Sequence, residues 1–159
     1  MGPFDSGEVT MDAVHRLAMR RDMGVLYDIR QQSILELAPP TMPGAEAKAW
    51  ALQLTLSGME RKLRELEIWV AELDGRVAGW GAIRGDRLEG LYVAPEFARQ
   101  GVGAELLDML EGLIRDRKFR SVRAEASSNA CDFYLRRGYR ATGPQTPEGA
   151  WPMAKELLT

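Results

Sequence analysis

Two glycines separated by one residue open a segment whose apolar spacing predicts a helix. They are Gly101 and Gly103 in the stretch FARQGVGAELL, residues 97–107. The start of a helix has backbone N–H groups without partners and about half a positive charge, so it attracts anions. Glycine also lets the backbone approach a phosphate without an intervening Cβ. The stretch has neither the Lys-Ser/Thr of a P-loop nor a GxGxxG spacing, so by itself it indicates a phosphate site or an ordinary turn equally well.

The chain has few of the side chains that commonly perform catalysis. It has one histidine, His15, near the chain start without a nucleophile motif around it, and one cysteine, Cys131, without a histidine neighbour. These counts disfavour a Ser-His-Asp triad and a covalent thiol route, and they exclude a disulfide framework and a Cys/His zinc cluster. We expect no metal site. An enzyme built on this chain would use carboxylates, a tyrosine or backbone groups.

Composition and charge limit the class of protein. The 159 residues are 45% hydrophobic and 28% charged, with a formal charge of −2. This length suits one core, so we expect a single domain over residues 1–159, with 1–10 as a disordered end. No apolar run approaches the roughly 20 residues that span a bilayer. The mixed charges argue against a nucleic-acid surface. We therefore expect a cytoplasmic protein with neither a membrane nor a nucleic-acid partner.

The first third of the chain is predicted to be mainly helical. A strand over 14–21 leads to Asp22, which is expected to cap a helix. One face of that helix holds Val25, Leu26, Ile29, Ser33, Ile34 and Leu37. Residues 38–44 contain three prolines and a glycine and end the helix. A second helix is expected over 45–54, and the charged run 60–67 is expected to be a solvated helical turn or connection.

The remainder is predicted to be a sheet with two further helices. Strands over 68–73 and 76–83 flank Asp74-Gly75, which favours a two-residue hairpin turn, and a third strand covers 87–95. From residue 102 a helix buries Leu106, Leu107, Leu110, Leu113 and Ile114, and it exposes Glu105, Asp108, Glu111 and Arg115. A strand over 121–126 precedes a short helix over 129–137, which Gly138 ends. Strands near 139–141 and 152–157 complete the sheet.

Two segments resemble the GCN5-related N-acetyltransferase (GNAT) superfamily. LYVAPEFARQGVGAELLDML resembles its acetyl-CoA-binding segment, in which the loop amides hold the coenzyme A pyrophosphate. SSNACDFYLRRGYRATG resembles a later block of the family, in which an Asn precedes a short helix carrying Phe-Tyr. Together the segments and the hairpin before them cover roughly residues 68–142, and the first third agrees only in element order. Ala98 stands where the family usually has Gln or Arg, which removes one side-chain contact.

The resemblance implies a fold and a reaction. The fold would be α+β (mixed α/β, three-layer), with a central mixed, mostly antiparallel sheet of six or seven strands flanked by about four helices. The reaction would be acetyl transfer from acetyl-CoA, without a metal, to a primary amine of a small molecule, peptide or protein by direct attack on the thioester. The alternative is a non-catalytic acyl-CoA-binding or sensing module, and a third interpretation is a phosphometabolite binder. Family members are frequently homodimers, and nothing in this sequence fixes an interface.

The resemblance also assigns roles to residues. Backbone amides would hold the pyrophosphate over Arg99, Gln100, Gly101, Val102, Gly103 and Ala104. The pantetheine arm would lie against the strand backbone of Leu91, Tyr92 and Val93, where the strand separates from its neighbour, and against Asn129. Tyr134 would give a proton to the leaving sulfur, although a core aromatic is the competing interpretation.

The general base is assigned to Glu89. A strand glutamate paired with Arg84 or Arg87 is an equally good interpretation. Glu67 and Glu72 are weaker alternatives for the base, and the resemblance also allows a reaction that relies on ordered water or the substrate alone. Strand alternation puts Glu89 on the face of Leu91 and Val93 unless a bulge intervenes. The resemblance places the acceptor site at residues 35–50 and 141–151, where Glu36, Glu46 and Glu148 would tolerate a cationic amine. Arg136 and Arg137 are further candidates for the coenzyme phosphates.

Overall fold

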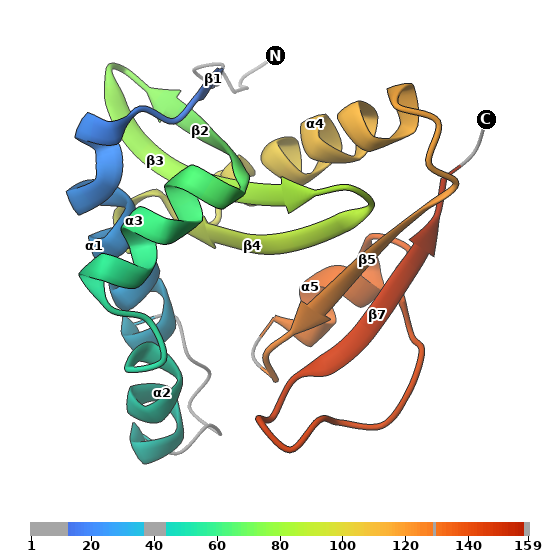
Figure 1. Cartoon of the computed structure of the whole chain (residues 1–159). Helices are drawn as coiled ribbons and strands as arrows, with labels where there is room; N and C mark the ends of the chain where they lie inside the picture. Colours follow the sequence, from blue (N-terminus) through green and yellow to red (C-terminus); the bar gives the residue numbers. More distant parts are fainter. Residues whose placement is uncertain (1–12, 37–43, 129, 158–159) are drawn as a thin grey trace, which may run out of the picture.

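The computed structural model describes residues 13–36, 44–128 and 130–157, which form one mixed sheet with helices on both faces (Figure 1). The sheet order is β1-β2-β3-β4-β5-β7-β6, and every neighbouring pair is antiparallel except β4 and β5. The strands are β1 (Val14–Leu17), β2 (Glu67–Leu73), β3 (Arg76–Arg84), β4 (Arg87–Val93), β5 (Ser121–Ala126), β6 (Arg140–Ala141) and β7 (Trp151–Glu156). The α-helices are α1 (Met23–Glu36), α2 (Gly44–Ala51), α3 (Leu56–Glu65), α4 (Val102–Asp116) and α5 (Cys131–Arg136). The predicted α+β fold with a mostly antiparallel sheet is confirmed.

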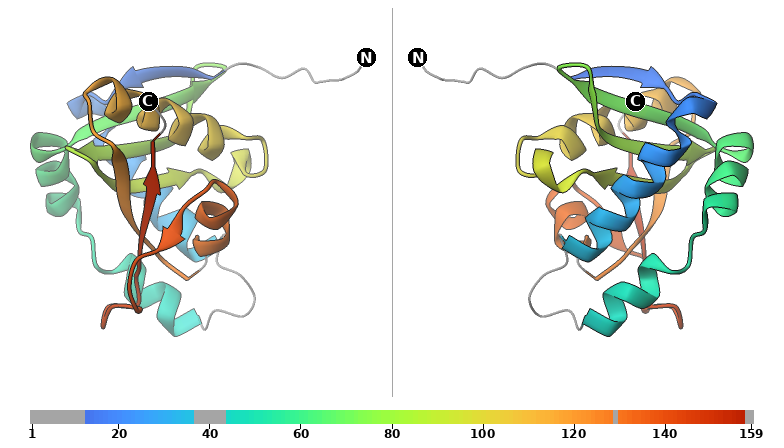
Figure 2. Two further views of the ribbon diagram at one scale, coloured as in Figure 1. Left: turned by 90° about the vertical axis from the view of Figure 1, so that its right-hand side faces the viewer. Right: turned by 90° about the vertical axis from the view of Figure 1, so that its left-hand side faces the viewer.

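The two faces of the sheet have separate apolar cores. Leu26 and Ile29 of α1 pack with Met59 of α3 over one face, around the fully buried Trp80. Leu106, Leu110 and Ile114 of α4 pack on the other face, where Tyr134 of α5 joins them. Figure 2 shows α1 and α4 on opposite sides of the strands. The layers therefore follow from the apolar stripe of each helix, which must be buried against the sheet.

The hairpin between β2 and β3 has the predicted two-residue turn. Asp74 and Gly75 have φ values of 54° and 76°, as a type I′ turn requires. Leu73 consequently pairs with Arg76, and the antiparallel ladder runs from there to Glu67 and Ile83. The turn chemistry thus sets the register next to the turn, and an irregularity between Ala71 and Glu72 shifts the register in the rest of the ladder.

An extra residue interrupts β4. Ala82 of β3 pairs with Gly90, but the next residue, Ile83, pairs with Leu88, so Glu89 is the additional residue of a bulge. On its other edge β4 pairs with β5 only at Arg87 and Leu88. From Glu89 onward the two strands diverge, as Figure 1 shows. This divergence opens the sheet at its centre.

The first third differs from the sequence prediction in three places. The first strand ends at Leu17, and a 3-10 turn over Arg20–Asp22 replaces its second half. On α1, Leu26, Ile29 and Ile34 are buried as expected, but Val25 is exposed, and Leu37 lies outside the described residues. The run 60–67 belongs largely to the ten-residue helix α3, which buries Met59. The charged residues of this run made the helix hard to recognise in the sequence, because the helix starts before the run, at Leu56, and its buried residue, Met59, also precedes the run.

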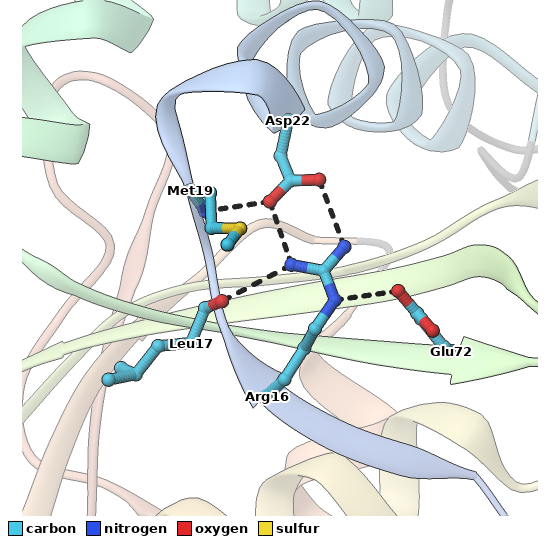
Figure 3. A network of polar contacts seen from close by, with 5 residues as sticks. All are labelled: Arg16, Leu17, Met19, Asp22 and Glu72. Atoms are coloured by element: carbon cyan, nitrogen blue, oxygen red, sulfur yellow. Dashed lines mark hydrogen bonds and ion pairs between the residues drawn. The ribbon is translucent and has the colours of Figure 1, made fainter.

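Arg16 explains why the first strand ends early. Its guanidinium donates to both carboxylate oxygens of Asp22, at 2.8 and 3.0 Å, and its Nε donates to Glu72 at 2.6 Å (Figure 3). The Asp22 carboxylate also accepts the N–H of Met19 at 2.7 Å, so it closes the turn before α1 instead of capping the helix amides. The hydrogen bonds from Arg16, more than any other cause, hold the pKa of Asp22 below its usual range. This network attaches α1 to the edge of the sheet.

Glu111 of α4 is buried, contrary to its predicted exposed position. Its carboxylate accepts the Tyr139 hydroxyl at 2.7 Å and the Lys155 ammonium at 2.9 Å. Burial, followed by this hydrogen bond, raises the pKa of Tyr139 well above its usual value. Residues from β7 and from the segment after α5 supply these partners, and helical periodicity within α4 carries no information about them.

Candidate active site

A cavity of about 100 Å³ lies where β4 and β5 diverge. Its lining includes Ser33 of α1, Trp50 of α2, Glu89 and Tyr92 of β4, Glu125 of β5 and Tyr134 of α5. The fold thus brings together the two candidate catalytic residues, which are 45 positions apart in the sequence. Carboxylates and a phenol at one opening are groups that can accept and donate protons.

Glu89 faces α3 because of the bulge. It lines the cavity between β4 and β5 and a second cavity that α3 borders, whereas Leu91 and Val93 pack in the core cluster that contains α4. The bulge that was named as the exception to strand alternation is therefore present, and Glu89 does not share the face of Leu91 and Val93. The carboxylate lies 3.5 Å from Nη2 of Arg84 and 3.7 Å from Nε of Arg87, and the side chain is 19% exposed. Both predicted arginine partners are present, on a side chain that also reaches the cavity.

Tyr134 lies at the border between the core and the cavity. Its residue is 6% exposed, and its ring packs edge-on against Phe133 and Tyr139, with centroid distances of 5.3 and 5.2 Å. Burial raises the pKa of its hydroxyl above the ordinary value, and the charges of Tyr92 and Glu111 add to this effect. The hydroxyl is consequently a protonated hydrogen-bond donor at neutral pH.

The loop before α4 has the positive φ angles that glycine adopts easily. Gly101 has a φ of 83° and precedes the first helical residue, and Arg99 has a φ of 65°. A Cβ on Gly103 would lie 3.3 Å from Cγ2 of Val93, so the absence of a side chain lets the start of α4 approach β4 closely. Within this fully described loop, the first amide of α4 that binds a backbone oxygen is that of Glu105, 3.0 Å from the Gly101 carbonyl. The preceding amides at the helix start suit an anion.

Arg30 joins α1 to the end of α2. It is 5% exposed, and it donates to the carbonyls of Ala51 and Trp50 at 3.2 and 3.3 Å and to Oε1 of Gln31 at 2.8 Å. Its guanidinium also lies 5.8 Å from the ring centre of Tyr92, which lines the cavity. Arg30 was not among the candidate residues predicted from the sequence. The sequence feature that could have indicated it is a charged residue next to Ile29, within the apolar stripe of α1.

The other candidates have varied positions. Leu91 and Tyr92 line the cavity, and Val93 lies near Gly103. Asn129 lies outside the described residues, and so does the side chain of Glu46. Glu36 and Glu148 are exposed and do not line the cavity, where Glu89 and Glu125 supply the carboxylates instead.

Four further residues were considered for binding or catalysis, and two of them, Arg136 and Arg137, have local partners. Arg136 donates to the Asp132 carbonyl at 3.3 Å, and Arg137 lies 5.0 Å from the ring centre of Phe133. Cys131 is a half-buried free thiol. His15 lies in β1, and its Nε2 is buried without a hydrogen-bond partner in the described structure.

The described residues contain neither a cluster of metal ligands nor a helix that could span a membrane. Within residues 13–36, 44–128 and 130–157, no three His, Cys, Asp or Glu side chains gather closely enough to hold a metal ion. In the same part of the chain, every helix is too short or too polar to cross a membrane.

Comparisons with known proteins agree on one family. The family model of the acetyltransferase (GNAT) domain matches residues 30–157. An uncharacterized N-acetyltransferase of Escherichia coli (strain K12), YafP, is 32% identical over 108 residues, which are 67% of this chain and 68% of that protein. The family model and the curated relative therefore indicate the same family.

Solved structures give the same result for the fold. A GCN5-related N-acetyltransferase from Rhodopseudomonas palustris superposes with a TM-score of 0.85 at 27% identity, over 95% of this chain and all of that chain. The PaiA N-acetyltransferase of Thermoplasma acidophilum, solved with coenzyme A, has a TM-score of 0.75 at 17% identity, over 92% of this chain and all of that chain. At that lower identity the likeness concerns the fold alone.

Proposed function

The chain belongs to the GNAT acetyltransferase family and is an N-acetyltransferase, and we propose that it transfers the acetyl group of acetyl-CoA directly to a primary amine. One observation carries the proposal: Glu89 and Tyr134 line one cavity at the point where β4 leaves β5. A base and a hydrogen-bond donor on two sides of one opening suit a reaction in which an amine loses a proton and a thiolate leaves.

The donor would bind along β4 and the glycine loop. Beyond Leu88 the backbone of Leu91–Val93 lacks a β5 partner, so its polar groups are available to a pantetheine amide and to the thioester carbonyl. The amides from Arg99 to Ala104 would hold the pyrophosphate, helped by the dipole of α4. The Thermoplasma structure, which shares this fold, was solved with coenzyme A, and this supports acetyl-CoA as the donor. Asn129 would contact the pantetheine arm.

Glu89 would act as the base. A primary amine is mostly protonated at neutral pH and has no free lone pair until the proton leaves. The Glu89 carboxylate would take this proton directly or through a water. The neutral nitrogen then forms a bond to the thioester carbonyl carbon and the carbon–sulfur bond breaks. The nitrogen loses its second proton to solvent, which balances the proton that the departing thiolate takes up. Arg84 and Arg87 keep the carboxylate at the cavity wall, at 3.5 and 3.7 Å.

Tyr134 would stabilise the departing thiolate. A thiol has an ordinary pKa of about 8.5, below that of a phenol, and burial raises the pKa of Tyr134 further. Complete proton transfer from this hydroxyl to sulfur is therefore uphill, and we assign Tyr134 a hydrogen bond to the sulfur. The proton that ends on the thiol comes from solvent, which receives the amine proton through Glu89.

Thiol release from acetyl-CoA in the presence of a panel of primary amines tests the proposal. We expect release with at least one amine, and a loss of roughly 100-fold in kcat for Glu89→Gln, because general-base catalysis contributes about 10²–10⁴-fold. The amide has almost the same shape as the carboxylate and cannot take the proton. Thermal stabilisation by coenzyme A should be equal in both proteins.

The outcomes separate the parts of the proposal. Glu89→Asp is the matched variant, because it keeps the carboxylate and should retain more activity than Glu89→Gln. An unchanged kcat in Glu89→Gln would remove the base role. Stabilisation by coenzyme A without thiol release from any amine would contradict direct acetyl transfer to a primary amine.

A further inference from the structure

We propose that the amine acceptor also carries a carboxylate, which Lys62 of α3 binds. This inference rests on the proposed function, because it places the amine of the same acceptor beside Glu89. The carboxylate site is the second cavity lined by Glu89, of about 370 Å³, between α3 and the ends of β3 and β4.

The second cavity has an excess of positive charge in a chain whose formal charge is −2. Arg61, Lys62 and Arg84 line it, against the two carboxylates of Glu65 and Glu89. Arg84 is already engaged with Glu89 at 3.5 Å. The remaining positive charge lies on α3, and an anion is its natural counterpart.

Lys62 is the cation that most needs a partner. It is half-buried, and its ammonium group makes no hydrogen bond and no ion pair within 4.0 Å with any residue that the structure describes. Desolvation lowers the pKa of its ammonium group, and the charge of Arg30 lowers it further. Arg30 is itself buried, and carbonyl and amide oxygens accept its hydrogen bonds. A carboxylate beside Lys62 would offset the unfavourable burial of an unpaired cation.

The cavity between β4 and β5 has the opposite character. Two carboxylates, Glu89 and Glu125, line it, and Arg87 lies between them, 3.7 Å from the first and 4.0 Å from the second. An ammonium group would bind at these carboxylates. Glu89 lines both cavities, so an acceptor that spans it meets acidic groups at one end and basic groups at the other. This arrangement fits a molecule with an amine at one end and a carboxylate at the other.

A matched panel of acceptors tests this inference. Glycine, β-alanine, γ-aminobutyrate and 5-aminovalerate would each be compared with the corresponding carboxamide by thiol release from acetyl-CoA. The dipeptides Gly-Asp and Gly-Asn would be compared in the same way as their C-terminal amides, so that only Gly-Asp carries a carboxylate. We expect kcat/KM for at least one carboxylate to exceed that of its amide about tenfold, as a charge-assisted hydrogen bond allows. Preference within the free amino acids indicates a small acceptor, and preference within the dipeptides indicates an acidic peptide.

The variants identify the residue that holds the carboxylate. Lys62→Met should raise the KM of the preferred carboxylate about tenfold and leave kcat/KM of its amide and the KM of acetyl-CoA unchanged. Lys62→Arg should keep the preference. Arg64→Met, on the same helix but away from the lining of the cavity, removes the same charge and should have no effect. Where circular dichroism shows that Lys62→Met does not fold, Lys62→Gln gives the same comparison.

Two results would overturn the inference while the proposed function stands: amides that serve as well as carboxylates, or a preference that Lys62→Met leaves intact. Thiol release with none of these amines, nor with primary amines that lack a carboxylate, such as benzylamine, would reject the proposed function and this inference with it.

Discussion

The proposed donor side and the proposed acceptor side of the cleft are built differently. The donor side, Leu91–Val93 and Arg99–Ala104, relies on backbone groups: an open strand edge, a φ of 83° at Gly101 and the close approach of Gly103 to Val93. The proposed acceptor side would rely on charged side chains from separate elements, chiefly Lys62 on α3, Glu89 on β4 and Glu125 on β5. A backbone site keeps one ligand while its side chains vary, whereas a side-chain site can change its ligand by single substitutions.

The largest expected effect concerns Glu111, and it tests whether the donor side and the acceptor side depend on the same buried contacts. Glu111→Leu removes the buried partner of Tyr139 and Lys155, whose contacts are 2.7 and 2.9 Å. Losing one member of a buried pair costs about 3 kcal/mol, so we expect the melting temperature to fall by roughly 6 to 12 °C. The KM values for donor and acceptor should change little below the new melting temperature. A selective rise in either KM would show that Glu111 serves one side in particular.

Gly103→Val should affect the donor side alone. A Cβ at this position lies 3.3 Å from Val93 and 3.8 Å from the Phe133 ring, and a branched side chain adds further overlap. Overpacking costs about 1 to 3 kcal/mol, so we expect the KM for acetyl-CoA to rise roughly 30-fold. Gly112→Ala is the control, because a Cβ there meets nothing within 4 Å. Equal KM values for acetyl-CoA in Gly103→Val and the wild type would contradict the backbone account of this site.

The donor side was the more predictable of the two. Gly101 and Gly103 stand close together in the sequence, and the features they indicate, a positive φ and a close approach, are local. The Asp74-Gly75 turn was predictable for the same reason. The roles of the loop amides in binding coenzyme A stay a prediction.

The acceptor side depends on information that one segment does not contain. The bulge at Glu89 arises from the pairing of β4 with β3, and it moved this side chain to the face that the alternation did not predict. Lys62 looked like part of a solvated charged run, although it follows the buried Met59 by three positions and so lies near the apolar face of α3. Glu111 looked exposed because its partners, Tyr139 and Lys155, come from distant segments.

Tyr134→Phe tests the residue that lies between the proposed donor side and the proposed acceptor side. The variant keeps the ring that packs on Phe133 and Tyr139, and it removes the hydroxyl proposed to stabilise the thiolate. A hydrogen bond to a charged group contributes about 1.5 to 3 kcal/mol, so we expect kcat to fall roughly tenfold or more with both KM values nearly constant. Steady-state kinetics measures this, and an unchanged kcat would leave Tyr134 as a core aromatic.

The smallest expected effect concerns pH and the acceptor side. Glutarate has two carboxylates and no amine, so it should compete with the acceptor at Lys62 without an amine titration of its own. Desolvation, and next the charge of Arg30, lowers the pKa of Lys62, so this ammonium loses its proton at lower pH than an ordinary lysine. Because the protonated form binds the anion, inhibition should weaken as pH rises through the alkaline range, and at lower pH than an ordinary lysine would cause.

The groups around Lys62 make this pH experiment specific. Arg30 and Arg84 approach it from α1 and β3 and keep their charge across this range, and Glu65 and Glu89 are the neighbouring carboxylates. In Lys62→Arg the guanidinium stays charged, so the inhibition constant of glutarate should be flat over the same pH range. A pH dependence equal in the wild type and Lys62→Arg would assign the titration to another group. A flat profile in the wild type, with glutarate still competitive, would place the anion on the arginines instead.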